Sequence, residues 1–136
     1  MPYTSYQRVK TALEHREPDR IPFDLGGAMV TGINIHALRN LKQLLGIPGE
    51  TWLWDQVTQL GVTDDATVER LGVDVRNVGP RPPANPGPAR DLGLVENHYR
   101  LIDEWGMGWQ MPRENGHYYD LYLSPLARAE TVADIE

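Results

Sequence analysis

The sequence of 136 residues contains no cysteine. Disulfide bonds, thiolate nucleophiles and cysteine-ligated zinc are therefore excluded from this chain. Long apolar runs are also missing. None approaches the ~18 residues of a membrane span, and the charged Arg8 and Lys10 come too early for the apolar stretch of a signal peptide. These absences predict a soluble, cytoplasmic protein with no membrane partner.

Basic charge is scarce as well. The 13 Lys and Arg residues are outnumbered by 19 Asp and Glu residues, which gives a net charge of −6. A protein that binds nucleic acid needs a basic stripe for the phosphate backbone, so we expect no nucleic-acid partner. The length is too small for a complete (β/α)₈ barrel of ~250 residues, but it allows one domain or a piece of a larger one.

Helix and strand signals alternate along the first half of the chain, which is typical of an α/β fold. Helices are predicted over residues 5–15, over residues 34–45, and from a cap at Thr63 or Asp64 to Leu71. Apolar residues expected to be buried are Tyr6, Val9, Ala12 and Leu13 in the first helix and Ile35, Leu38, Leu41, Leu44 and Leu45 in the second.

Strand signals lie between and after these helices. Strands are predicted over residues 20–25 and 51–57, followed by an extended segment over residues 73–78. Further along, residues 97–103, 107–111 and 118–123 predict three strands, which together form a β-hairpin insertion.

The segment 79–93 contains five of the 11 prolines and three of the 13 glycines, and we expect an extended surface loop there. Near the end of the sequence, Thr131 and Asp134 have the spacing of a helix N-cap and its N3 residue. An isolated helix needs ~12–15 residues to be even marginally stable. We therefore expect the protein to continue beyond Glu136, with residues 1–136 belonging to a single domain.

Asp24 lies in an apolar segment just before the glycine pair Gly26 and Gly27. Barrel and open-sheet enzymes place their chemistry at such strand ends, where a carboxylate can bind a hydroxyl or a metal, or act as a base. Alternatively, Asp24 accepts hydrogen bonds from the backbone of the turn. The glycines, with Gly32, match neither a phosphate loop nor a dinucleotide loop. They are interpreted as permitting backbone bends beside a ligand.

Asp55 follows Trp52 and Trp54. Burial among these aromatic rings would raise the pKa of its carboxyl group, whereas an exposed Asp55 would simply end a strand. Asp103 and the acid after it precede two tryptophans, Trp105 and Trp109, on a predicted hairpin. There we expect solvated acids and packed rings, with a binding lip as the alternative. The four histidines have no His-x-His or His-x-x-x-His spacing, so we expect no metal site in this chain.

The segment Arg8–Gly27 (RVKTALEHREPDRIPFDLGG) resembles the opening of the uroporphyrinogen decarboxylase superfamily. More narrowly, it resembles the decarboxylase-like proteins related to corrinoid-dependent methyltransferases. The similarity continues in order through short pieces over nearly the whole chain: Thr31–Ile33, Glu69–Arg76, Asp103–Gly106 and Ser124–Leu126. It implies the N-terminal portion of a (β/α)₈ TIM barrel. Residues 21–25 would be its first strand, residues 34–45 the following helix and residues 79–123 a loop and hairpin excursion.

The same resemblance implies a set of site residues at the barrel mouth. In the decarboxylases the catalytic aspartate precedes an Ala-Leu-Gly-like segment, and Asp55 similarly precedes Arg70–Val75 (RLGVDV). Asp55 is therefore the implied catalytic residue, together with Asp24. The implied substrate-binding residues are Gly26, Gly27, Thr31 and Gly32. Decarboxylases hold substrate carboxylates with arginines after the first strand, but residues 26–31 contain none. This favours the methyltransferase branch, because a substrate with many carboxylates needs fixed cations.

The resemblance also implies partners. In the methyltransferase branch, zinc held by His and Cys ligands activates a thiol acceptor, and a corrinoid protein carries the methyl group. Those ligands lie in the later part of the family, so we expect this chain alone to bind no cofactor. Two alternatives stay open: uroporphyrinogen decarboxylation in porphyrin biosynthesis, and a shortened, non-catalytic paralogue that acts as an interaction module.

Overall fold

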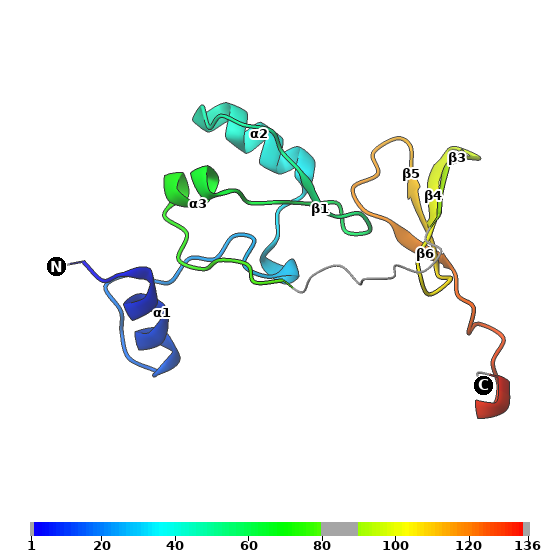
Figure 1. Cartoon of the computed structure of the whole chain (residues 1–136), viewed down its shortest axis with the longest axis horizontal. Coiled ribbons are helices and arrows are strands. Elements are labelled where there is room, and N and C mark those ends of the chain that lie inside the picture. Colours follow the sequence, from blue (N-terminus) through cyan, green and yellow to red (C-terminus); the bar gives the residue numbers. More distant parts are fainter. Residues whose placement is uncertain (1, 80–89, 135–136) are drawn as a thin grey trace. The chain divides into compact units, whose positions relative to one another are not determined.

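The computed structural model describes residues 2–79 and 90–134, which divide into two compact units. Unit 1 contains residues up to 55 and residues 59–79, and unit 2 contains residues 56–58 and the described residues from 90 onwards. Three α-helices and a two-stranded sheet form unit 1, and a four-stranded sheet forms unit 2 (Figure 1). The predicted mixture of α and β structure is confirmed. Both sheets are antiparallel and open.

All three predicted helices are present: α1 (Ser5–Leu13), α2 (Ile35–Leu45) and α3 (Asp65–Leu71). Each begins at a side chain that accepts a backbone N–H, namely Thr4, Asn34 and Asp64. Glycines in the left-handed conformation, Gly46 and Gly72, end α2 and α3. In the described residues, no helix has the length and apolar character needed to cross a membrane.

Of the four apolar residues of α1 that were predicted to be buried, Val9 and Ala12 are half-buried and the other two are exposed. Tyr6 and Leu13 are 74% and 76% exposed, whereas Arg8 and Thr11 are buried. In α2, Ile35 and Leu38 are buried as predicted, but Leu44 is 82% exposed. The apolar periodicity predicted the wrong buried face of α1. Arg8 is buried there because its ion pairs, described below, make burial of a charged side chain favourable.

The strand predicted over residues 20–25 is not formed, but the segment is extended and lies beside residues 73–78. The backbone N–H of Asp74 donates to the carbonyl of Phe23 at 2.7 Å. Further along both segments, Nδ2 of Asn77 donates to the carbonyl of Gly27 at 3.1 Å. Because the partners advance in the same direction, the two segments are parallel, and α2 lies in the connection between them. A strand ladder needs more than this one backbone bond.

The strand predicted over residues 51–57 is shorter in the structure. β1 (Leu53–Asp55) pairs antiparallel with β2 (Leu60–Gly61), which was not predicted. Gly61 is packed so closely against α2 that an added Cβ would come within 2.8 Å of Leu38 Cδ2. The small hairpin is therefore fixed to the helix that supplies the core of unit 1.

Unit 2 is a meander in the order β3 (Arg90–Val95), β4 (His98–Ile102), β5 (Gly108–Pro112) and β6 (Asp120–Leu123). The three predicted strands correspond to β4, β5 and β6. The loop prediction over residues 79–93 was wrong for residues 90–93, which belong to β3, and residues 80–89 lie outside the described residues. Near the C-terminus, Val132–Asp134 form a 3₁₀ turn in which Asp134 accepts from Thr131, as its capping spacing indicated.

Candidate functional site

A buried ionic cluster holds the two parallel segments of unit 1 together. The side chain of Asp74 is fully buried, and its carboxylate accepts the backbone N–H of Phe23 at 2.9 Å. The guanidinium groups of Arg8 and Arg20 bind the same carboxylate at 2.6 and 2.7 Å. Arg8 also binds Asp19 at 2.7 Å. The cluster therefore connects α1, the segment 20–25 and the segment 73–78.

The cluster changes the pKa values of its members. Burial of Asp74 acts to raise its pKa, but the Phe23 N–H and the side chains of Arg8, Ser5 and Arg20 outweigh it and lower the pKa to about 2. The hydrogen bond from Arg8 lowers the pKa of Asp19 to about 2 and raises the pKa of Arg8 itself. The lowered pKa values keep Asp74 and Asp19 ionised at neutral pH, and their ion pairs connect three segments of the chain, so we assign the cluster a structural role. A charged residue between Val73 and Val75 was its signal in the sequence.

The glycine segment predicted to bend beside a ligand is a closed loop. Its N-terminal anchor is Asp24, whose Oδ1 accepts the N–H of Gly27 at 2.8 Å and whose Oδ2 accepts the hydroxyl of Thr31 at 3.0 Å. The N–H of Gly26 donates to the carbonyl of Thr31 at 2.8 Å. Asp24 therefore stabilises the loop through both carboxylate oxygens, in agreement with the backbone-acceptor alternative.

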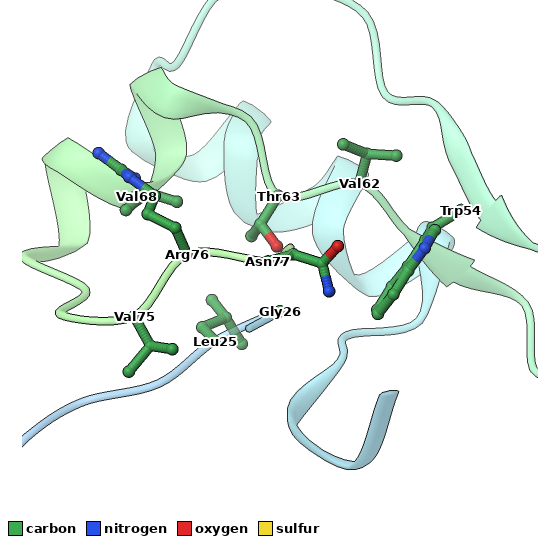
Figure 2. Close-up of a pocket in the computed structure, with 9 residues that line it drawn as sticks. All are labelled: Leu25, Gly26, Trp54, Val62, Thr63, Val68, Val75, Arg76 and Asn77. Atoms are coloured by element: carbon green, nitrogen blue, oxygen red, sulfur yellow. The ribbon is translucent and has the colours of Figure 1, made fainter. Parts of the chain in front are cut away.

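A pocket of about 80 Å³ lies at the carboxyl ends of the two parallel segments (Figure 2). Gly26 and Leu25 come from the end of the first segment, and Asn77 comes from the end of the second. The remaining lining residues come from β1, from α3 and its preceding turn, and from the second segment: Trp54, Val62, Thr63, Val68, Val75 and Arg76. Its volume is about half that of a 150 Å³ cavity that holds benzene.

Gly26 is fitted closely against the pocket wall. Its φ of +83° is left-handed, and an added Cβ would come within 1.7 Å of Thr63 Oγ1. No other residue type fits at this position without displacing Thr63. The glycine thus allows the loop to approach the turn before α3 and shapes one side of the pocket.

The polar groups around the pocket are mostly uncharged. In Figure 2, the carboxamide of Asn77 lies between the Thr63 hydroxyl and the Trp54 ring, whereas the Arg76 side chain extends towards α3. The Arg76 guanidinium lies 3.7 Å from the carboxylate of Asp65. The lining of the pocket therefore combines apolar side chains, one aromatic ring, two neutral hydrogen-bonding groups and the cationic Arg76, which is paired with Asp65.

The predicted site residues are only partly brought together. Gly26 lines the pocket, whereas Gly27 and Thr31 close the loop through Asp24. Gly32 packs against Leu60. Asp55 is half-buried in β1, next to the lining residue Trp54 but outside the lining set.

Sequence reasoning missed Thr63 and Asn77 as pocket residues. Thr63 was considered only as a helix cap, a role that Asp64 takes in the structure. Asn77 had a usable signal, because it is a polar residue at the end of an extended, valine-rich segment. A strand end in an α/β protein is where ligand contacts are expected.

The described residues offer no zinc site. Within residues 2–79 and 90–134, no three His, Asp or Glu side chains are grouped closely enough to hold a metal ion. The chain also contains no cysteine. The ligand set that the methyltransferase resemblance implies is therefore not provided by these residues, and no chemical step of this chain is assigned to zinc.

Comparisons with known proteins give no relative: no protein-family model matches the chain, and no significant match is found among curated proteins or solved structures.

Proposed function

We propose that this chain is the N-terminal part of a uroporphyrinogen decarboxylase-like enzyme of the corrinoid-related methyltransferase branch. The observation that carries the proposal is the pocket at the carboxyl ends of two parallel extended segments, whose connection contains α2, the β1–β2 hairpin and α3. Parallel segments with a helical crossover are the repeating unit of (β/α)₈ barrels. In that fold, substrates bind at the carboxyl ends of the strands.

The exposed apolar side chains of unit 1 give independent support. Leu13 in α1 and Leu44 in α2 are 76% and 82% exposed, and Ile21 in the first parallel segment is 85% exposed. In a complete barrel such positions pack against further strands and helices. The proposal therefore includes additional barrel elements that cover these side chains.

Within this proposal, Asp24 is a positioning residue and Asp55 is the candidate catalytic residue. Both oxygens of Asp24 already bind the loop, so its role is to hold Gly26 beside the pocket. Asp55 follows Trp54, whose ring lines the pocket. A small-molecule substrate would bind in the pocket, and a corrinoid protein would bring the methyl group.

The proposal is tested by reading the transcript past the codon for Glu136 and expressing the chain that it encodes. We expect the frame to continue, and we expect the product to transfer a methyl group from a methylated corrinoid protein to a thiol. Asp55→Asn should lower the rate at least tenfold, while Glu50→Gln, the same acid-to-amide change at an exposed position of unit 1 outside the pocket lining, serves as the control. Unchanged turnover in Asp55→Asn would remove Asp55 from the catalytic residues.

Tetrapyrrole decarboxylation is the runner-up within enzymes, and the same preparation tests it. Loss of carboxyl groups from uroporphyrinogen without added cofactor would favour it. The arrangement of Arg76 counts against it, because the guanidinium is directed towards Asp65 and a substrate with many carboxylates needs several fixed cations.

A non-catalytic interaction module is favoured by a different observation. Leu94 in β3 and Leu121 in β6 are both 48% exposed within unit 2, which suits contact with a partner chain. A stop codon directly after Glu136, together with a cooperative thermal transition of the 136-residue protein, would support this alternative over the enzyme.

A further inference from the structure

We infer that the pocket of unit 1 binds a small, uncharged, planar group that carries a hydrogen-bond donor and an acceptor, as a primary carboxamide does. The inference rests on the proposed function only in taking this pocket as the substrate site. It specifies the chemical class of the group that enters it.

The hydrogen-bonding capacity of Asn77 defines the polar end of the pocket. Its Nδ2 donates one hydrogen to the carbonyl of Gly27 at 3.1 Å, which fixes the plane of the carboxamide. The second Nδ2 hydrogen and the carbonyl Oδ1 are available for one donor and one acceptor of a ligand. A primary amide offers this complementary pair in a single plane.

Thr63 adds a second neutral group. Its Oγ1 lies against Gly26 at the pocket wall, and within the described residues its hydroxyl makes no hydrogen bond. A hydroxyl can donate to a ligand carbonyl or accept from a ligand N–H. Of the lining residues only Arg76 is charged, and its guanidinium is paired with Asp65. The two groups left to bind a ligand, Asn77 and Thr63, contribute no charge. They favour a neutral ligand over an ion, which would need a counter-charge when it leaves water.

The rest of the lining fits a flat and partly apolar group. The Trp54 ring stands at one end of the pocket in Figure 2, and valines and Leu25 form most of the other walls. A planar group can stack on the indole. The volume of about 80 Å³ limits the buried part to roughly four heavy atoms. Acetamide has four heavy atoms and is the probe that we would use.

Binding is measured by NMR on the ¹⁵N-labelled 136-residue chain. Acetamide is expected to shift the Asn77 side-chain amide and the Trp54 indole N–H in a saturable way, with half-saturation at about 1–10 mM, as suits so small a ligand. Acetate has the same size and shape but a negative charge, and it should bind at least tenfold more weakly.

The variant Thr63→Val removes the hydroxyl and keeps the side-chain shape. It should weaken acetamide binding about fivefold, while Thr51→Val, a matched change in unit 1 outside the pocket lining, should leave it unchanged. Acetate binding as tightly as acetamide would overturn the inference in favour of an anion site. An absence of saturable shifts, or unaltered binding in Thr63→Val with retained backbone signals, would also overturn it.

These outcomes are independent of the enzyme assay. If acetamide binds as described but the longer chain transfers no methyl group, the proposed function fails and the ligand class stands. If methyl transfer occurs and Thr63→Val changes neither acetamide binding nor the KM for substrate, the ligand class fails and the proposed function stands.

Discussion

Different kinds of interaction stabilise unit 1 and unit 2, each within itself. In unit 1, the buried charged side chains of Arg8, Lys42 and Asp74 connect elements that are far apart in sequence, such as Arg8 and Asp74, which are 66 positions apart. Unit 2 is built from antiparallel ladders between consecutive strands, and Asp103 closes one of its turns through bonds that span at most six positions. The removal of a single charge should therefore lower the stability of unit 1 as a whole. In unit 2, a single substitution should lower stability mainly around the substituted turn or strand.

The largest expected effect follows from Asp74→Asn. The amide removes the negative charge opposite Arg8 and Arg20, and within the described residues the buried Arg8 keeps only Asp19 as a counter-charge. We expect the free energy of unfolding of unit 1 to fall by about 3 kcal/mol, the lower end for breaking a buried pair. Amide hydrogen exchange, measured separately for the two units, checks this. Unit 2 should keep its protection factors.

The matched control for this change is Asp65→Asn. The Asp65 side chain is 86% exposed, and its distance to Arg76 is 3.7 Å. An exposed pair contributes little, so the loss should stay below about 0.5 kcal/mol. Equal losses for Asp74→Asn and Asp65→Asn would show that the cluster does not stabilise unit 1.

The next largest effect is expected from acidification, which should destabilise unit 1 before unit 2. The pKa values of Asp19 and Asp74 are lowered to about 2 in the folded protein, compared with about 3.9 for an unfolded aspartate. Folding thus favours the ionised form, and this stability is complete above about pH 4 and is lost as the pH falls through 2. NMR signals of unit 1 should weaken in this window. In unit 2 the pKa of Asp103 is also lowered, but only one turn depends on it. Earlier loss of unit 2 signals would contradict the comparison.

A glycine substitution tests the fit of the pocket loop. Gly26→Ala forces alanine to adopt a φ of +83° and brings its Cβ against Thr63 Oγ1, so we expect a loss of at least about 2 kcal/mol. Gly46→Ala is the control, because its φ of +65° is similar but no atom lies within 4 Å of the added Cβ. It should cost about 1 kcal/mol. Urea denaturation measures both.

The stability lost through the contact between the added Cβ at position 26 and Thr63 Oγ1 can be measured apart from the backbone strain. Thr63→Ala removes Oγ1, and in a Gly26→Ala background it should recover part of the lost stability. The same Thr63→Ala change in a Gly46→Ala background should recover none. Additive effects in both backgrounds would mean that only backbone strain matters at Gly26.

Local patterns predicted the helices and three of the four strands of unit 2 because their causes lie within a few residues. Caps such as Thr4 and Asp64 and the left-handed glycines are examples. The pairing of the segments 20–25 and 73–78 could not be predicted in this way, because it depends on Asp74 reaching Arg8 across 66 positions. In the same way, Gly26 was predicted as a site residue, but its neighbours Thr63 and Asn77 come from remote segments.

A smaller loss, confined to unit 2, is expected from Asp103→Asn. Oδ1 of Asp103 accepts the N–H groups of Trp105 and Met107, each at 2.9 Å, and Oδ2 accepts the indole N–H of Trp109 at 2.8 Å. An amide nitrogen in place of one oxygen cannot accept its bonds, so stability should fall by about 1–1.5 kcal/mol. Hydrogen exchange of β4 and β5 should rise. Glu104→Gln, an exposed neighbour, should change nothing measurable.

The smallest expected effect concerns the contact between β4 and β6. The guanidinium of Arg100 lies 5.1 Å from the centre of the Tyr122 ring, and Arg100 is also held by Glu96 at 3.1 Å and Gln110 at 3.3 Å. Tyr122→Leu keeps an apolar side chain but removes the ring, and we expect a loss of about 0.5 kcal/mol. Tyr118→Leu, at a 58% exposed position of the same unit, is the control. If Tyr122→Leu lowered the free energy of unfolding as much as Asp74→Asn, unit 2 would also depend on one charged contact between strands. The distinction between the two units would then no longer hold.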